Sequence, residues 1–304
     1  MELTSYSQTK PLAGEDGNNR KIALLAVLAM FTRKVALLAV LAMFACLALG
    51  GGPQALAQYS GSQKFCGEDV PLRRAEVHES VDQELLLLSE AKARVWTTLR
   101  RSDRYLPIIE KALRDQKVPL DFKYLPMAVT NLDPQYRSGN RRGLWRLTET
   151  EAAAAGLVVN ANLDERLDPT ASSEAAAKKL ASLKQSQGTW TLALAAFLDP
   201  SALATAMSEA GQNGDYFSLY VPEGLEKSVS LVLAGKILYS APEVYGYRLT
   251  QPWPVLASGR RRVEGNQSLR ELANYYKVDY RTFRDMNPHL IGDIAPSGAY
   301  VNTP

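Results

Sequence analysis

Apolar side chains recur at the three- and four-residue spacing of α-helices from Ser80 to about residue 240. Leu106, Ile109 and Leu113 mark the inward face of one helix, and the stretch Glu223 to Ser240 shows the same spacing. The alternating pattern of half-buried strands is missing from this region. The pattern therefore predicts an all-helical domain over residues 79–247.

Helix ends in this domain are marked by residues that cap a first turn or stop a last one. Tyr124–Thr130 and the almost wholly apolar Trp190–Leu198 are predicted as short helices, the second of them central in the core. Gly156 and Gly188 are the predicted stops of two further helices. The pairs that indicate helix starts are Ser80 with Gln83, Pro119 with Asp121, Thr148 with Glu151, and Asp168 with Pro169.

Beyond the helical domain the chain changes character at "YRLTQPWPVLASGRRR", which predicts a linker over residues 248–260. Residues 261–304 then predict a small β-α-α-β unit docked on the larger domain, because so short a segment builds only a marginal core alone. The basic run Arg260 to Arg262 is interpreted as a solvated edge. The elements expected are a strand at Arg261–Val263, helices at Leu269–Tyr276 and Tyr280–Met286, and a strand at Ala299–Val301.

The first 57 residues predict a leader, followed by an N-terminal tail over residues 58–78. "KIALLAVLAMF" recurs as "KVALLAVLAMF", and neither copy is long enough to span a bilayer. From Met30 onward a basic start, an apolar core and "ALAQ" form a secretory signal with cleavage after Ala57. We expect synthesis from Met30 and export to the periplasm, with any membrane contact made through the leader; a lipid anchor at Cys46 is the alternative.

Composition excludes several function classes. The 35 basic and 32 acidic residues give a net charge of +3, too small to indicate a nucleic-acid partner. After cleavage Cys66 is the single cysteine, which predicts a free thiol or an intermolecular link. His78 and His289 are interpreted as isolated surface residues, so we expect neither a metal site nor a cofactor.

Four fragments, "YLPMAVTNLDP", "GLW", "DERLDP" and "WTLALAAF", occur in this order between about Val70 and Tyr247. With them the chain resembles the lytic murein transglycosylases, specifically the membrane-bound type D group with its SLT domain. The resemblance implies a mostly α, goose-lysozyme-like fold and a groove for peptidoglycan glycan strands. The terminal unit, with "VEGNQSLRELANYYKVDYRTFRDMNP", resembles a divergent LysM module.

The resemblance also points to a missing acid. In that family the third helix reads Y-L-x-x-x-E-S, and its glutamate is the sole catalytic carboxyl, acting as acid and then as base while a 1,6-anhydro ring closes. This chain has Val129 at the glutamate position, and valine has no titratable proton. Asp133 and Glu149 are the candidate replacement acids, although a helix exit and a helix start are the ordinary interpretations of the two.

Other positions of the implied groove differ from the family as well. Arg146 stands where the family has a glutamine, and Phe197 and Leu198 replace a tyrosine and an asparagine. Trp145 and Trp190 are interpreted as core aromatics, in preference to platforms on which a sugar ring stacks. The groove candidates are Tyr124, Val129, Thr130, Asn131, Trp145, Arg146, Phe197 and Leu198.

Three interpretations stay open. The first is an exported, non-catalytic relative that binds glycan strands or a cell-wall enzyme. The second is an active transglycosylase with a relocated acid, cleaving between the two sugars of the strand. The third is a helical protein that binds a partner and has no sugar affinity.

Overall fold

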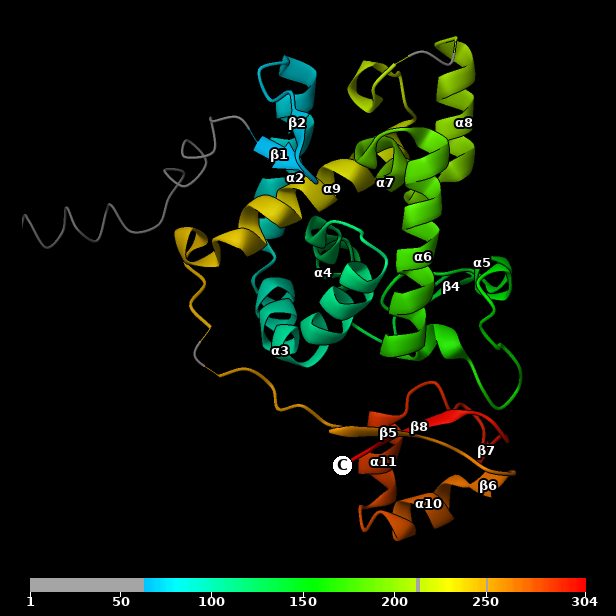
Figure 1. The fold of residues 1–304 in the computed structure, drawn as a ribbon. Helices are drawn as coiled ribbons and strands as arrows, with labels where there is room; N and C mark the ends of the chain where they lie inside the picture. The colour runs from blue at the N-terminus through cyan, green and yellow to red at the C-terminus, as the bar shows by residue number, and fades with distance from the viewer. Residues whose placement is uncertain (1–62, 212–213, 250) are drawn as a thin grey trace, which may run out of the picture. The chain divides into compact units, whose positions relative to one another are not determined.

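The structure is a computed structural model that describes residues 63–211, 214–249 and 251–304 (Figure 1). The predicted signal peptide, its start at Met30, its cleavage after Ala57 and the alternative anchor at Cys46 lie outside these residues. Within the described ranges, none of the helices is both long enough and apolar enough to cross a bilayer. The described residues belong to one compact unit.

The described chain begins with a short hairpin that packs into the helical core. β1 (Gln63–Phe65) pairs antiparallel with β2 (Glu68–Val70), and the fully buried ring of Phe65 lies edge-on to Phe122 at 5.3 Å. Cys66, in the turn, is half-buried, and burial followed by the nearby Asp121 carboxylate raises the pKa of its thiol. The segment predicted as a tail therefore contains ordered structure from Gln63 onward.

Helix α2 spans Ala75–Glu90, so it starts before the cap predicted at Ser80. That prediction was wrong: Ser80 lies inside the helix, and its Oγ is 2.8 Å from Oγ of Ser230 on α9. The N-cap position of α2 has no side-chain hydrogen bond. The side chain of Ser80 therefore makes a contact between two helices, whereas the local pattern had assigned it to a helix cap.

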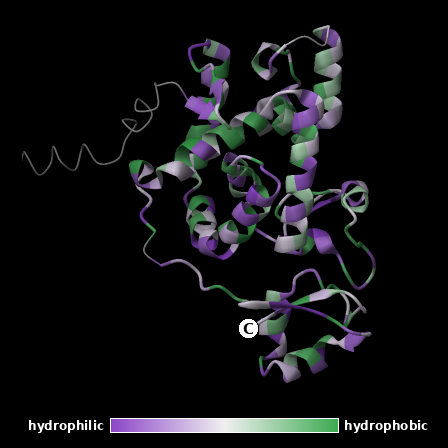
Figure 2. Cartoon of the chain, viewed as in Figure 1, coloured by the Kyte–Doolittle hydropathy of each residue, from purple (hydrophilic) through white to green (hydrophobic). Residues whose placement is uncertain are grey.

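The centre of the domain is built from α3 (Lys92–Asp115), α4 (Tyr124–Thr130) and α9 (Glu223–Ser240). α9 packs against both α2 and α4 (Figure 1). Its buried residues are mainly apolar, and much of its ribbon has the colour of hydrophobic residues (Figure 2). Gly235 permits this approach, because a Cβ there would stand 2.7 Å from Cβ of Ala128. A 3₁₀ turn, Leu120–Lys123, leads into α4 after Pro119. The helical prediction for this region is confirmed.

The remaining helices are α5 (Glu149–Ala154), α6 (Pro169–Gln187), α7 (Trp190–Leu198) and α8 (Pro200–Glu209). The capping box before α5 is confirmed, since Thr148 Oγ1 accepts from Glu151 N and Glu151 Oε2 accepts from Thr148 N. Asp168 caps α6 as predicted, and α7 has the predicted bounds with a buried centre. Helix α8 was not predicted.

The C-terminal unit has two short antiparallel strand pairs around two helices. β5 (Gly259–Arg262) pairs with β8 (Tyr300–Thr303), and β6 (Gln267–Ser268) pairs with β7 (Ile294–Ala295). α10 (Leu269–Tyr275) and α11 (Tyr280–Met286) lie between them in the chain. The unit has its own apolar core, in which Leu269, Phe283 and Leu290 are fully buried. β6 and β7 were not predicted, and the likeness to LysM stays a prediction.

Backbone hydrogen bonds join this unit to the loop before α6. Asp164 N donates to His289 O at 2.8 Å, and Ile291 N donates to Asn162 O at 2.9 Å. Between these bonds Leu163 extends into the apolar core of the C-terminal unit. His289 was predicted as a surface residue, and this was wrong: its side chain is 1% exposed, because it is enclosed between the unit and this loop.

Candidate functional site

Three segments of the helical domain meet at the end of α4. Thr130 Oγ1, on the last residue of α4, donates to Leu144 O at 2.9 Å. The ring of Trp145 lies 6.1 Å from that of Phe197 on α7, in an edge-to-face arrangement. The structure thus brings together the fragments "YLPMAVT", "GLW" and "LALAAF", which are far apart in the sequence.

Val129 lies on the last turn of α4 and is half-buried against the domain core. The helix ends at Asn131, whose backbone is left-handed at φ 55°. Arg94 donates from Nε to Asn131 Oδ1 at 2.7 Å and also bonds Ala128 O. A cation at the carboxyl end of a helix is favourable, so Arg94 has a structural role beside Val129.

Four of the predicted groove residues are buried. Trp145 is fully enclosed and donates from Nε1 to Ser173 Oγ at 2.9 Å. Thr130 turns its hydroxyl inward, and burial raises the pKa of the Tyr124 phenol. The ring of Phe197 is buried against that of Trp145. Trp145 therefore serves the core in this structure, as the apolar runs around it indicated.

The other four candidates, Val129, Asn131, Arg146 and Leu198, are half-buried and retain contact with solvent. Arg141 connects two of them, since its Nη1 donates to Arg146 O at 3.0 Å and its Nη2 to Leu198 O at 3.5 Å. The end of α7 is thereby tied to the loop after Trp145. These four are the predicted groove residues that keep some exposure to solvent.

The two candidate acids lie in polar surroundings. Asp133, partly exposed, accepts from Gln135 N at 3.0 Å and faces Arg101 Nη2 at 3.9 Å. Glu149 is exposed in the first turn of α5. A general acid of a glycosidase is held in an apolar pocket, which neither carboxyl has here. Whether either one acts as a catalytic acid stays a prediction.

Glu151 is a site residue that sequence analysis identified only as a cap. Its carboxylate also accepts from Lys179 Nζ at 2.6 Å and lies 3.5 Å from Arg141 Nη1. Burial favours its neutral form, but the hydrogen bonds from Lys179 and Thr148 N outweigh burial and hold the pKa of Glu151 below its ordinary value. A carboxylate kept charged in this way is suited to fixing Arg141 and not to donating a proton.

A group of arginines borders the site, and sequence analysis missed it. β3 (Arg137–Ser138) and β4 (Arg141–Arg142) form a small antiparallel hairpin in which Arg137 is opposite Arg142. Arg146 follows in the next turn, with a left-handed φ of 53° and its guanidinium 5.9 Å from the ring of Tyr136. The signal was the fragment "RRGLWR", in which three arginines flank the buried Leu144 and Trp145.

Over the described residues, no three side chains of the histidine, cysteine, aspartate or glutamate type gather where a metal ion could bind. His289 and Asp168 come within 3.9 Å of each other, but both already contact residues of the protein.

Comparison with known families identifies one part of the chain. Residues 108–199 match the Transglycosylase SLT domain. The SLT match runs from within α3 to the end of α7, so it includes α4 with Val129, the loop with Trp145 and the contact between Trp145 and Phe197. It supports the lytic transglycosylase family that the fragments indicated. No curated protein matches the chain.

Proposed function

We propose that this protein is an exported, peptidoglycan-associated relative of the lytic transglycosylases that binds glycan strands without cleaving them. The single observation that carries the proposal is Val129 on the last turn of α4. The SLT match extends over this position, and the resemblance assigns it to the one catalytic carboxyl.

The chemistry of the reaction makes that position decisive. The glycosidic oxygen must receive a proton as the bond breaks, and the sugar hydroxyl that closes the ring must lose one. A positioned acid or base contributes roughly 10²- to 10⁴-fold to such a step. The side chain of Val129 has neither a proton to give nor a lone pair to take one. The packing of Trp145 against the ring of Phe197 supports the idea that the frame of the site outlasted its chemistry.

A partner-binding protein without sugar affinity is the second candidate, and a specific contact favours it. Arg141 bridges to Leu198 O and Arg146 O, so the end of α7 and the loop after Trp145 are tied together where the family's groove would lie. The partner we propose for this case is a cell-wall enzyme. An active enzyme using Asp133 or Glu149 has less support, since both carboxyls lie in polar, partly exposed surroundings.

The proposal includes the periplasm as location and a LysM-like role for residues 261–304 as a second glycan contact. The support is the pattern of the leader and of the terminal unit in the sequence.

Two measurements on the whole mature chain test the proposal. In the first, purified sacculi are sedimented after mixing with the chain or, as the control, with bovine albumin. We expect the chain to sediment with the sacculi and albumin to stay in solution. In the second, the same sacculi are digested and the soluble products are examined for 1,6-anhydro sugar ends, and we expect none. Absence of binding would favour the partner-binding candidate, and freshly formed anhydro ends would establish an active enzyme.

A further inference from the structure

We propose that the arginines beside the site, Arg137, Arg142 and Arg146, bind carboxylates carried by the ligand, so that the protein selects a glycan strand bearing anionic substituents. The inference rests on the proposed glycan binding and adds the chemical class that is recognised. It starts from an imbalance of charge at the hairpin β3–β4.

The first observation is a like-charge pair without a counter-ion. Arg137 and Arg142 are directly opposite each other in the antiparallel register of β3 and β4. Like charges opposite each other on neighbouring strands destabilise the pair. No carboxylate within residues 63–211, 214–249 and 251–304 forms an ion pair with either arginine. Arg142 Nη1 already donates to Gly139 O at 2.7 Å and to Arg141 O at 3.0 Å. An anion bound by the remaining donors of the two guanidinium groups would reduce this repulsion.

The second observation is an unused donor on Arg146. Its Nε is buried and has no hydrogen-bond partner, although buried polar groups are nearly always bonded. The guanidinium lies over the ring of Tyr136, which holds its plane in place. No carboxylate of the described part of the chain forms an ion pair with Arg146 either. The buried Nε is closed to a ligand, so Nη1 and Nη2, which have no hydrogen bond within the described residues, are the donors available for contact with a carboxylate.

The neighbouring Arg141 differs from these three arginines because it has a carboxylate partner. It has Glu151 at 3.5 Å and donates to two backbone carbonyls. Glu151 in turn accepts from Lys179 Nζ and from Thr148 N, so its carboxylate already has partners. The hairpin and the turn after it therefore present three cations with spare donors beside a single neutralised pair. A neutral sugar would gain little from such a surface, whereas a carboxylate would gain a charge-assisted contact.

Binding to two forms of the same polymer tests the inference. Purified sacculi are compared with sacculi whose carboxyl groups have been converted to amides, which leaves the sugar backbone unchanged and removes the negative charges. We expect the natural chain to bind native sacculi about tenfold more tightly than amidated ones, with the difference shrinking as salt is raised.

Three variants locate the effect. Arg142→Gln and Arg146→Gln should each reduce binding to native sacculi severalfold and leave binding to amidated sacculi unchanged. Arg114→Gln is the matched control, because Arg114 is an exposed arginine on α3 whose ion pair with Glu110 lies outside both the hairpin and the C-terminal unit. Circular dichroism and thermal unfolding of each variant show that it is folded, and if Arg146→Gln fails to fold, Arg142→Gln decides alone.

The outcomes separate this inference from the function on which it rests. Equal binding of the natural chain to native and amidated sacculi would overturn the carboxylate site and leave glycan binding standing. A charge preference that Arg142→Gln retains in full would likewise overturn the assignment. Failure to bind either polymer would instead remove the proposed function itself.

Discussion

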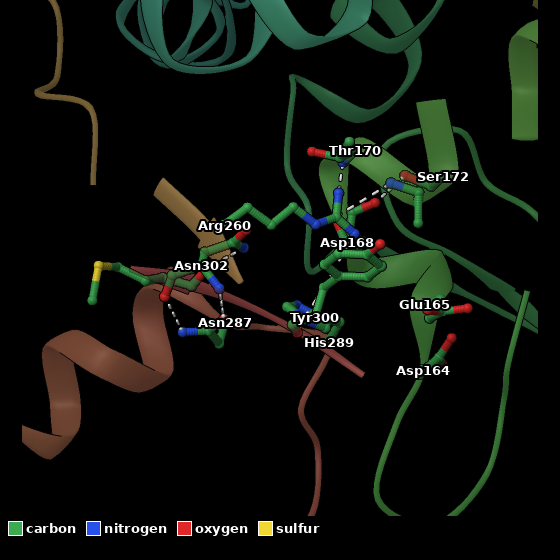
Figure 3. A network of polar contacts seen from close by, with 12 residues as sticks. Asp164, Glu165, Asp168, Thr170, Ser172, Arg260, Asn287, His289, Tyr300 and Asn302 are labelled. Carbon is green, nitrogen blue, oxygen red and sulfur yellow. Dashed lines mark hydrogen bonds and ion pairs between the residues drawn. The ribbon is translucent and has the colours of Figure 1, made fainter. Parts of the chain in front are cut away.

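Arg260 Nη2 lies 2.7 Å from Asp168 Oδ2, so a residue of the C-terminal unit pairs with the carboxylate that caps helix α6 (Figure 3). The other oxygen of Asp168 accepts from Thr170 N and Ala171 N in the first turn of α6. The guanidinium of Arg260 also lies 4.5 Å from the ring of Tyr300. One buried carboxylate thus stabilises a helix and holds the C-terminal unit at the same time.

The first prediction concerns this pair. We expect Arg260→Gln to destabilise the docked arrangement by about 3 kcal/mol, because it leaves the charge of Asp168, only 1% exposed, without its cation. Hydrogen exchange measures the change: the amides of Asp164 and Ile291, which bond His289 O and Asn162 O, should exchange faster.

Arg281→Gln, on α11 of the same unit, is the control for this stability measurement, because the Arg281–Asp285 pair is exposed and such pairs contribute little. Unchanged exchange at Asp164 and Ile291 in Arg260→Gln would show that the hydrogen bonds of the loop hold the unit without the ion pair.

Local signals in the sequence predicted local structure well. Thr148 with Glu151 and Asp168 with Pro169 placed two helix starts correctly, because a cap is made within three or four residues of itself. The apolar run Trp190–Leu198 gave the bounds of α7. Cap chemistry and periodicity are properties of a short segment, so a single sequence contains them.

Contacts between distant segments were beyond this reasoning. The run Arg260 to Arg262 was interpreted as a solvated edge, and for Arg260 this was wrong, since its partner Asp168 is far away in the chain. The prediction of a surface position for His289 was wrong for the same reason, because the burial of this side chain depends on the loop around Leu163. At the site, Val129 was recognised by resemblance, whereas the opposition of Arg137 and Arg142 required the strand register.

The second prediction concerns Gly143, at the start of the loop after the hairpin. A Cβ there would lie 1.8 Å from Arg166 O, and φ is +75°, so alanine meets both a backbone clash and a strained conformation. We expect Gly143→Ala to lower the unfolding free energy by roughly 3 kcal/mol or more, measured by urea denaturation.

Gly224→Ala is the control for this substitution. Gly224 lies in the first turn of α9, and a Cβ added there would have no atom within 4 Å of it. We expect this change to be neutral or slightly stabilising. Similar stability of the two variants would show that the loop moves away from Arg166 at little cost.

The third prediction is a dependence of stability on pH through Glu151. Its pKa in the folded protein lies below the ordinary value of 4.5, so folding favours its charged form. The resulting stability is present above pH 4.5 and is lost as the pH falls towards the lowered value. We expect Glu151→Gln to cost about 1 kcal/mol at neutral pH through the weakened cap, and to flatten the acid branch of the profile.

Urea denaturation between about pH 3 and pH 7, the range over which carboxyl groups titrate, measures both effects. Glu209→Gln, at the exposed end of α8, is the control and should leave the profile unchanged. An acid branch that stays as steep in Glu151→Gln as in the natural chain would assign the loss to other carboxyls.

The fourth prediction tests the proposed role of position 129 by placing a carboxyl there. We expect Val129→Glu to release products with 1,6-anhydro ends from sacculi that the natural chain leaves intact, because the new carboxyl stands on the half-buried last turn of α4. The gain should fall within the roughly 10²- to 10⁴-fold range of one acid–base group and reach less than an intact family site would, since Arg146 and Leu198 remain.

Val129→Gln is the control for this gain, since glutamine has the shape of glutamate and no titratable proton. It should release nothing, so that a difference between the two variants reports the proton alone. Products from the natural chain at the rate of Val129→Glu would mean that another carboxyl already does this work. Silence of both variants would mean that the side chains at Arg146 and Leu198, and not the absent acid alone, prevent cleavage at the end of α4.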